Sequence, residues 1–177
     1  MRYALIALAI VGALILTIVV VGLLLPIKHR ASREATYNRP AAEVFRAIAT
    51  PTDFPAWRTG VTKVDVLPAR DGKSSWREFG KDGTILFEVE RSVPDTALVT
   101  RIADRSLPFG GTWSYTLVPK GDSTTLRIVE DGEVYNPVFR FVSRFVMGHT
   151  ATIDRYLGDL GKRLGDKDVV IRSSEAE

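Results

Sequence analysis

A stretch near the C-terminus, residues 136–165, constrains the fold most, because both its ends and its pattern indicate one long helix. Asn136 suits an N-cap and Pro137 the first helical position, whereas Gly165 suits the left-handed residue beyond the end. Between them a largely apolar stripe recurs at steps of three or four residues, formed by Val138, Val142, Phe145, His149, Ile153, Tyr156, Leu160 and Leu164. At about 1.5 Å per residue the helix is roughly 42 Å long, which suits a helix that lies across a sheet.

The sequence pattern of residues 32–134 predicts such a sheet. Apolar and polar side chains alternate along several segments, for example at Ile85, Phe87 and Val89, which is typical of strands with one buried face. One strand precedes two short helices, the first of which begins at Pro40, and six strands follow them. Because short turns join these strands, they favour an antiparallel meander. We therefore expect an α+β domain in which a curved sheet of seven antiparallel strands surrounds the long C-terminal helix.

The N-terminus carries a second constraint, since residues 3–27 contain no charged side chain. A helix of this length spans about 37 Å, which exceeds the roughly 30 Å hydrocarbon core of a bilayer. We interpret residues 1–27 as a transmembrane helix that anchors the chain in a membrane. A cleaved signal peptide is the alternative, but the apolar region is longer than the usual stretch of about 7–15 residues and ends without a small-x-small cleavage site.

The charges that flank this segment predict its orientation and the division of the chain. Basic residues follow it at 28, 30, 33 and 39, so the positive-inside rule places the globular domain in the cytoplasm. Residues 28–31 are predicted to form a basic juxtamembrane linker that can meet anionic lipid head groups, and residues 166–177 a flexible tail. The globular domain is expected between them, at residues 32–165. Its charges are interspersed, so no nucleic-acid surface is predicted.

Several kinds of chemistry are excluded by what the sequence lacks. It has no cysteine, which excludes disulfides, thiol catalysis and zinc held by thiolates. It also has no nucleophile elbow, P-loop or dinucleotide fingerprint. Its two histidines, His29 and His149, have no neighbouring ligand at metal-binding spacing. We therefore expect neither a metal nor a bound cofactor.

Three groups of residues resemble the SRPBCC superfamily. They are Pro-Ala-Ala-Glu-Val-Phe at 40–45 followed by Phe-Pro-Ala-Trp at 54–57, Glu-Asp-Gly-Glu-Val at 130–134, and Gly-His-Thr-Ala at 148–151. This superfamily includes START-type lipid-transfer domains and polyketide cyclase/dehydrase-like proteins. The resemblance covers residues 32–164 and implies a helix-grip fold with an internal cavity for a hydrophobic small molecule or lipid. It carries over no catalytic residue, because the working residues differ between subfamilies.

Two polar residues are candidates for such a cavity. His149 lies on the apolar stripe, where it could orient a ligand or act as a general base, or could instead hydrogen-bond a strand as part of the core. Glu130 should point inward by strand alternation, and a buried carboxylate needs a partner such as His149 or Arg77. A bulge near Gly132 would instead turn Glu130 outward.

Aromatic side chains on the same surfaces either line the cavity or fill it as core, namely Phe87, Trp113, Tyr115, Phe145 and Tyr156. By contrast, Glu88 and Glu90 share the opposite face of their strand, so we expect a solvated outer face rather than an acid/base pair.

The sequence thus favours a membrane-anchored binding protein for a hydrophobic or amphipathic molecule held between the sheet and the C-terminal helix. A cyclase or hydrolase is the alternative, and it requires Glu130 and His149 about 2.6–3.2 Å apart, directly or through one water. A third hypothesis is a protein-interaction module, which a cavity below about 300 Å³ would favour.

Overall fold

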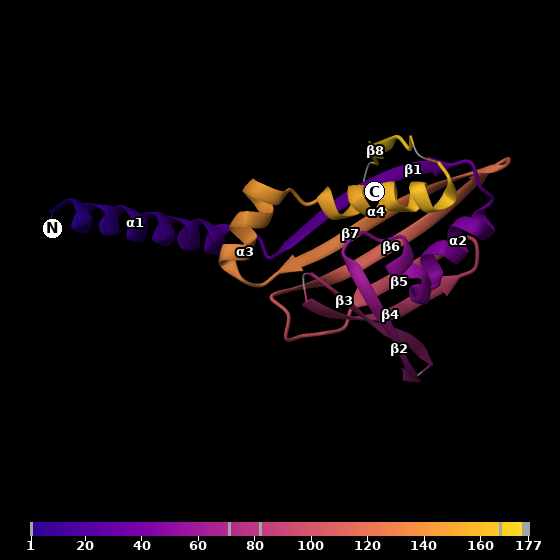
Figure 1. Cartoon of the computed structure of the whole chain (residues 1–177), viewed down its shortest axis with the longest axis horizontal. Coiled ribbons are helices and arrows are strands. Elements are labelled where there is room, and N and C mark those ends of the chain that lie inside the picture. Colours follow the sequence, from indigo (N-terminus) through magenta and orange to yellow (C-terminus); the bar gives the residue numbers. More distant parts are fainter. Residues whose placement is uncertain (1, 71, 82, 167, 175–177) are drawn as a thin grey trace.

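The computed structural model describes residues 2–70, 72–81, 83–166 and 168–174. It consists of an apolar helix, α1 (Arg2–Leu24), that projects from an α+β domain (Figure 1). The domain contains one sheet in which neighbouring strands are antiparallel, with the order β2-β3-β4-β5-β6-β7-β1-β8. The expected α+β architecture is therefore confirmed, with an eight-stranded sheet in place of the predicted seven strands.

The strands follow one another along the chain with few interruptions. They are β1 (Lys28–Tyr37), β2 (Val61–Arg70), β3 (Lys73–Gly80), β4 (Gly83–Val93), β5 (Ala97–Ile102), β6 (Phe109–Lys120), β7 (Ser123–Val134) and β8 (Ile171–Ser173). Two short helices separate β1 from β2, namely α2 (Ala41–Ala49) and the 3₁₀ helix η1 (Pro51–Ala56). After β7 come α3 (Pro137–Val142), the π-helical turn η2 (Ser143–Met147) and α4 (Ala151–Leu164).

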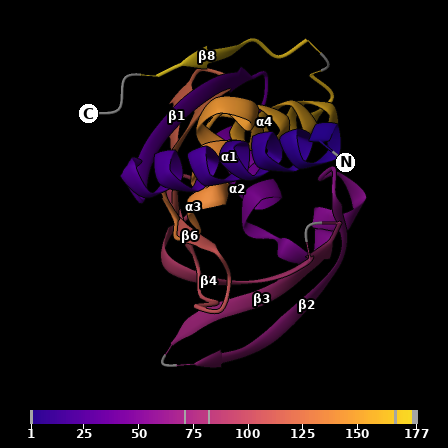
Figure 2. The ribbon, with the colours of Figure 1, turned by 90° about the vertical axis from the view of Figure 1, so that its left-hand side faces the viewer.

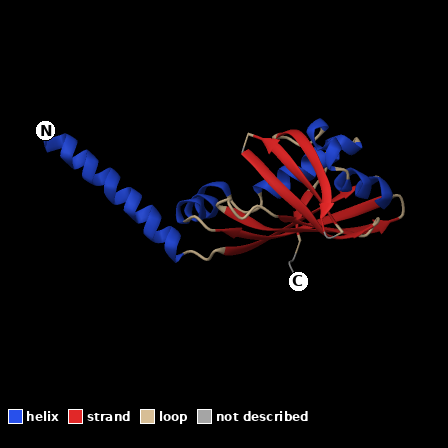
Figure 3. Ribbon diagram, turned by 90° about the horizontal axis from the view of Figure 1, so that it is seen from below, coloured by secondary structure: helices blue, strands red, loops and turns tan. Residues whose placement is uncertain are grey.

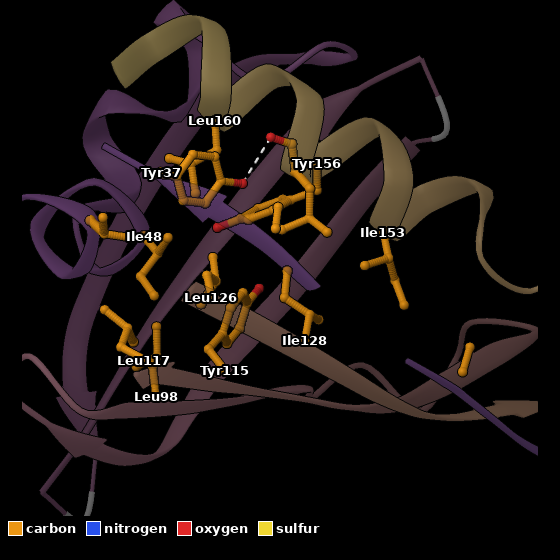
Figure 4. Close-up of a cluster of buried hydrophobic side chains, with 14 residues drawn as sticks. Tyr37, Ile48, Leu98, Tyr115, Leu117, Leu126, Ile128, Ile153, Tyr156 and Leu160 are labelled. Carbon is orange, nitrogen blue, oxygen red and sulfur yellow. Dashed lines mark hydrogen bonds between the residues drawn. The ribbon is translucent and has the colours of Figure 1, made fainter. Parts of the chain in front are cut away.

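The sheet curves around α4, as Figure 2 shows from the end of the molecule. Helix α4 buries Ile153, Leu157 and Leu160 completely against the inner face of the sheet. Their partners include Leu126 and Ile128 of β7, and Figure 4 shows this packing. Burying each of these side chains is worth about 1.5–3 kcal/mol relative to leaving it exposed, so this contact is a major source of stability.

Polar side-chain contacts hold α4 in place against β1. The hydroxyl of Tyr37 donates a hydrogen bond to the carbonyl oxygen of Leu157 at 2.9 Å. The guanidinium of Arg33 reaches the Asp154 carboxylate at 2.9 Å and the Thr150 hydroxyl at 3.1 Å. The helix is therefore held at its start and its middle by one strand.

The expectation of one helix over residues 136–165 is wrong, because the helical conformation is interrupted at Gly148. This residue has φ 74° and ψ 151°, a conformation outside the helical region that glycine adopts readily. Both predicted ends are nevertheless confirmed: Asn136 accepts hydrogen bonds from two backbone N–H groups of the first turn, and Gly165 is left-handed with φ 86°. The part of the stripe beyond Gly148 packs on the sheet, whereas Phe145, before the glycine, is 59% exposed.

The ends of the domain also differ from the predicted division. Residues 28–31, expected as a linker, are the first residues of β1, so α1 meets the sheet almost directly. The Val134 N–H donates to the Ile27 carbonyl oxygen at 2.9 Å, which extends this pairing toward α1. Within the expected flexible tail, β8 pairs with β1 at residues 33–35, while positions 167 and 175–177 lie outside the described residues. The tail therefore contributes the additional strand.

Helix α1 extends away from the domain but contacts it at its C-terminal end (Figure 3). A Cβ atom at Gly22 would lie 2.0 Å from the carbonyl oxygen of Pro137, so only glycine permits this approach. One guanidinium nitrogen of Arg140, Nη1, donates to the Leu25 carbonyl oxygen at 2.8 Å. The remainder of α1 is exposed, and the helix is long and apolar enough to cross a membrane.

Candidate functional site

A pocket of about 360 Å³, which we call the junction pocket, opens where α1 meets the domain. Its apolar lining comes from the α1–β1 connection and the end of β7, namely Leu25, Pro26, Ile27 and Val134. Its polar lining comes from the start of β1, from α3 and from the residues between α3 and α4, namely Lys28, His29, Arg30, Arg140, Ser143, Arg144 and His149. Among the described lining residues there is no Asp or Glu. The pocket thus combines an apolar wall with a concentration of basic groups.

The two histidines of the chain meet at this pocket. Their rings stack with centroids 4.0 Å apart and an angle of 20° between the planes. Nε2 of His29 lies 3.3 Å from Oε1 of Glu130, and Nδ1 of His149 lies 3.3 Å from the Ser143 hydroxyl oxygen. The predicted inward position of Glu130 is confirmed, but its partner is His29 rather than His149 or Arg77. Among the described residues, no group of three His, Asp or Glu side chains is placed to hold a metal ion.

Strand register brings His29 and Glu130 together. In the β1–β7 pair, His29 lies opposite Gly132 and Ala31 lies opposite Glu130, so the imidazole and the carboxylate are diagonal neighbours on one face. A Cβ atom at Gly132 would lie 2.4 Å from Nε2 of His29, so this glycine leaves space for the ring. The register runs through Gly132 without a shift, and the alternative of a bulge there is wrong.

The environment of His149 favours its neutral form. Burial lowers the pKa of His149 below its ordinary value, and the nearby charges of His29 and Arg144 lower it further. The Glu130 carboxylate opposes this shift. A neutral imidazole can both donate and accept hydrogen bonds, which suits a group that orients a ligand. His149 lies in the connection between η2 and α4 rather than within a helix.

Sequence reasoning missed two further residues of this pocket. His29 was assigned to a linker, although its alternation with the inward residues Ala31 and Ala35 would have placed it on the inner face of β1. Arg140 is 8% exposed, and its Nη1 and Nη2 atoms donate to the carbonyl oxygens of Leu25 and Tyr135. Its Nε atom is buried without a hydrogen-bond partner among the described residues. No sequence pattern distinguishes this arginine from its neighbours.

Three of the predicted aromatic residues form a cluster deeper between the sheet and α4. The ring of Tyr156 lies 5.5 Å from that of Trp113 and 5.8 Å from that of Tyr115, between centroids. Burial raises the pKa of Tyr115 to about 12 and that of Tyr156 well above its ordinary value. The guanidinium of Arg58 lies 5.1 Å from the Tyr156 ring centroid and pairs with Glu78 at 2.6 Å. These tyrosines therefore stay protonated at neutral pH.

The two other predicted aromatics lie apart from this cluster. Phe87 of β4 stacks on Trp76 of β3, with ring centroids 5.4 Å apart, and Trp76 in turn contacts Phe54 of η1. Phe145 packs on Phe141 at 5.0 Å and is otherwise exposed, because η2 precedes the break at Gly148. Its predicted place in the cavity is therefore wrong. Glu88 and Glu90 occupy the outer face as expected, where both pair with Arg101.

A curved antiparallel sheet that surrounds a C-terminal helix, with short helices inserted after the first strand, defines the class of START-like helix-grip proteins. Residues 28–165 match the model of the family described as polyketide cyclase / dehydrase and lipid transport. The chain belongs to this family, which confirms the resemblance to the SRPBCC superfamily. None of the curated proteins matches the sequence significantly.

Solved structures from several organisms share the fold. A START superfamily protein from Mycobacterium smegmatis is similar with a TM-score of 0.62 and 17% identity over 77% of this chain and 97% of its own. The Zhui aromatase/cyclase from Streptomyces sp. R1128 has a TM-score of 0.59 and 12% identity, covering 80% and 94%. Norcoclaurine synthase from Thalictrum flavum has a TM-score of 0.60 and 12% identity, covering 79% and 88%. At these identities the likeness shows the fold alone.

Proposed function

We propose that this protein is a membrane-anchored binding protein for an amphipathic small molecule or lipid, held in the junction pocket. The observation that carries this proposal is the pocket itself, which has an apolar wall, a basic wall and a volume of about 360 Å³. Ligand pockets usually measure about 300–1,000 Å³, so the volume suits a small molecule or one end of a lipid.

The anchor is the second part of the proposal. Helix α1 is long enough to span a bilayer, and the segment α3–η2 (residues 137–147) packs against its end. That segment exposes a group of large apolar side chains, namely Val138, Phe139, Phe145, Val146 and Met147. Exposed apolar groups beside a spanning helix lie at the level of the membrane surface, where lipid can cover them. The basic residues that follow α1 favour a cytoplasmic domain.

This arrangement gives a ligand a route from the bilayer. The pocket is bounded by the last residues before β1 and by α3–η2. With α1 in a bilayer, its apolar wall would therefore lie beside the membrane surface. An amphipathic molecule can then keep its apolar part against Leu25 and Ile27 while its polar part meets His29 and His149. The middle of the space between the sheet and α4, where the sequence predicted the cavity, is occupied by packed core side chains (Figure 4).

Native mass spectrometry of the full chain in mild detergent tests the proposal. We expect a defined lipid or small-molecule adduct on the wild-type protein. Ser143→Trp should abolish the adduct by filling the pocket, whereas Thr116→Trp adds the same bulk to an exposed position on the outer face of the sheet and should retain it. A wild-type protein without adduct, or an adduct that survives Ser143→Trp in a folded variant, would contradict the proposal.

A specific observation keeps the enzyme hypothesis as a second candidate. His29 and Glu130 lie 3.3 Å apart with side chains only 15% and 19% exposed, so they can act as an acid/base pair in place of the expected Glu130 and His149. If the protein is an enzyme, the adduct on the wild-type chain should change mass with time, and Glu130→Gln should stop this change. An adduct of constant mass on both proteins supports binding alone.

A further inference from the structure

We infer that the junction pocket selects lipids with an anionic head group, and that Arg140 and Arg144 recognise the anion. This inference rests on the proposed function and deepens it by naming the ligand's chemical class. Phosphate and carboxylate groups are the anions that lipids carry, and both accept paired hydrogen bonds from a guanidinium.

Acidic side chains of β7 balance part of the charge around the pocket, since Glu130 lies 3.3 Å from His29. Lys28 and Arg30 reach Glu133 and Asp131 of the neighbouring strand, but only at 3.8 and 3.6 Å and at the exposed rim. Exposed pairs of this kind contribute little and exchange readily with other partners. Neither Arg140 nor Arg144 belongs to any ion pair among the described residues. The pocket therefore carries positive charge that an anion would neutralise.

Arg140 gives the strongest indication of an anion. The residue is 8% exposed, and the two described hydrogen bonds of its guanidinium go to neutral carbonyl oxygens. Its Nε atom has no described partner at all. A buried cation without a counter-ion is unfavourable, since it loses water and gains no opposite charge in return. A ligand anion in the pocket that Arg140 lines would supply that charge.

The position of the pocket indicates that the anion belongs to a lipid. Arg140 hydrogen-bonds the backbone at Leu25, one residue beyond α1, and α3 packs on α1 at Gly22. The basic groups therefore lie at the level where an anchored helix leaves the hydrocarbon, which is the depth of lipid head groups. The exposed apolar side chains of α3–η2 lie beside the pocket and can contact acyl chains. His149 and Ser143 add uncharged donors for the rest of the head group.

The test compares two lipids with identical acyl chains on the full-length protein in nonionic detergent. Native mass spectrometry should show phosphatidylglycerol binding about tenfold more tightly than phosphatidylcholine. A tenfold difference in affinity is what one charge-assisted hydrogen bond provides. Arg144→Gln should reduce this preference several-fold, and Arg140→Gln should abolish it. The matched control is Arg155→Gln, which removes an exposed guanidinium from the outer side of α4 and should leave the preference unchanged.

The outcomes separate this inference from the proposed function. Equal binding of the two lipids, or a preference that survives Arg144→Gln and a folded Arg140→Gln, would overturn the inference while the binding function stands. If neither lipid binds the wild-type protein, both the inference and the proposed function are overturned. Glycerol 3-phosphate distinguishes the source of the anion: it should compete only weakly, and competition equal to that of phosphatidylglycerol would show a site for a soluble anion instead of a lipid.

Discussion

Helix α4 and the segment α3–η2 continue the same apolar pattern in the sequence, yet they occupy opposite environments. Beyond Gly148, the apolar side chains of α4 are buried against the sheet, with Ile153, Leu157 and Leu160 completely inaccessible. Before Gly148, most of the apolar side chains of α3–η2 remain exposed beside α1, and Val146 reaches 72% exposure. A stripe therefore establishes that a partner surface is needed but not which one. In our account α4 has the sheet as its partner and α3–η2 has the membrane surface.

The largest difference between the two segments should appear in stability. Leu157→Ala in α4 leaves a cavity in the core and should lower the free energy of unfolding by about 2–5 kcal/mol. Val146→Ala in η2 removes an exposed side chain and should change it by less than about 0.5 kcal/mol. Denaturant titration of the full chain in detergent measures both. Similar losses for the two variants would mean that α3–η2 is part of the core.

A smaller effect on stability is expected where α3 meets α1. Gly22→Ala places a Cβ atom 2.0 Å from the Pro137 carbonyl oxygen, so the backbone must move, at a cost of about 1–3 kcal/mol. Hydrogen exchange should then increase in α3–η2 but not in α4. Gly12→Ala is the matched control, because its Cβ atom would have no neighbour within 4 Å. Unchanged exchange in Gly22→Ala would show that the two helices are not coupled.

The smallest expected effect on stability comes from the protonation of His149, which lies between the two segments. Its pKa is lowered in the folded protein, mainly by burial, so the unfolded chain binds a proton more readily. Stability should therefore fall slightly as the pH decreases through the ordinary histidine range near about 6.5, and level off once the folded protein is protonated. His149→Gln should remove this part of the pH dependence. A wild-type protein that gains stability from this protonation would contradict the assigned shift.

Local rules predicted much of the fold. Alternation identified the strands, and the capping residues Asn136 and Gly165 fixed the ends of the C-terminal region. The break at Gly148 was missed because a glycine inside a periodic pattern is compatible with a continuous helix, and only the surroundings decide. The strand β8 was missed because its three residues follow a loop and gain their pairing from β1, a contact between distant parts of the chain.

The candidate site was predicted only in part, for a related reason. Strand alternation correctly placed Glu130 on the inner face, but its partner depended on the β1–β7 register. That register brings His29 to Glu130 because β1 begins at Lys28, earlier than the apolar pattern alone suggested. Arg140 became a candidate only through its burial against the end of α1, which is a tertiary contact. Pairing across strands and helices thus supplied what residue patterns could not.

The chain contains only two histidines, and both line the junction pocket, so their side-chain NMR signals test the central claim most directly. The measurement is a titration of the full-length protein in detergent with phosphatidylglycerol, with the imidazole resonances of His29 and His149 as the readout. Our account predicts that the resonances of both histidines shift together and saturate as lipid is added, and that Ser143→Trp removes these shifts. Lipid binding that leaves both histidines unchanged would place the ligand elsewhere and contradict the account.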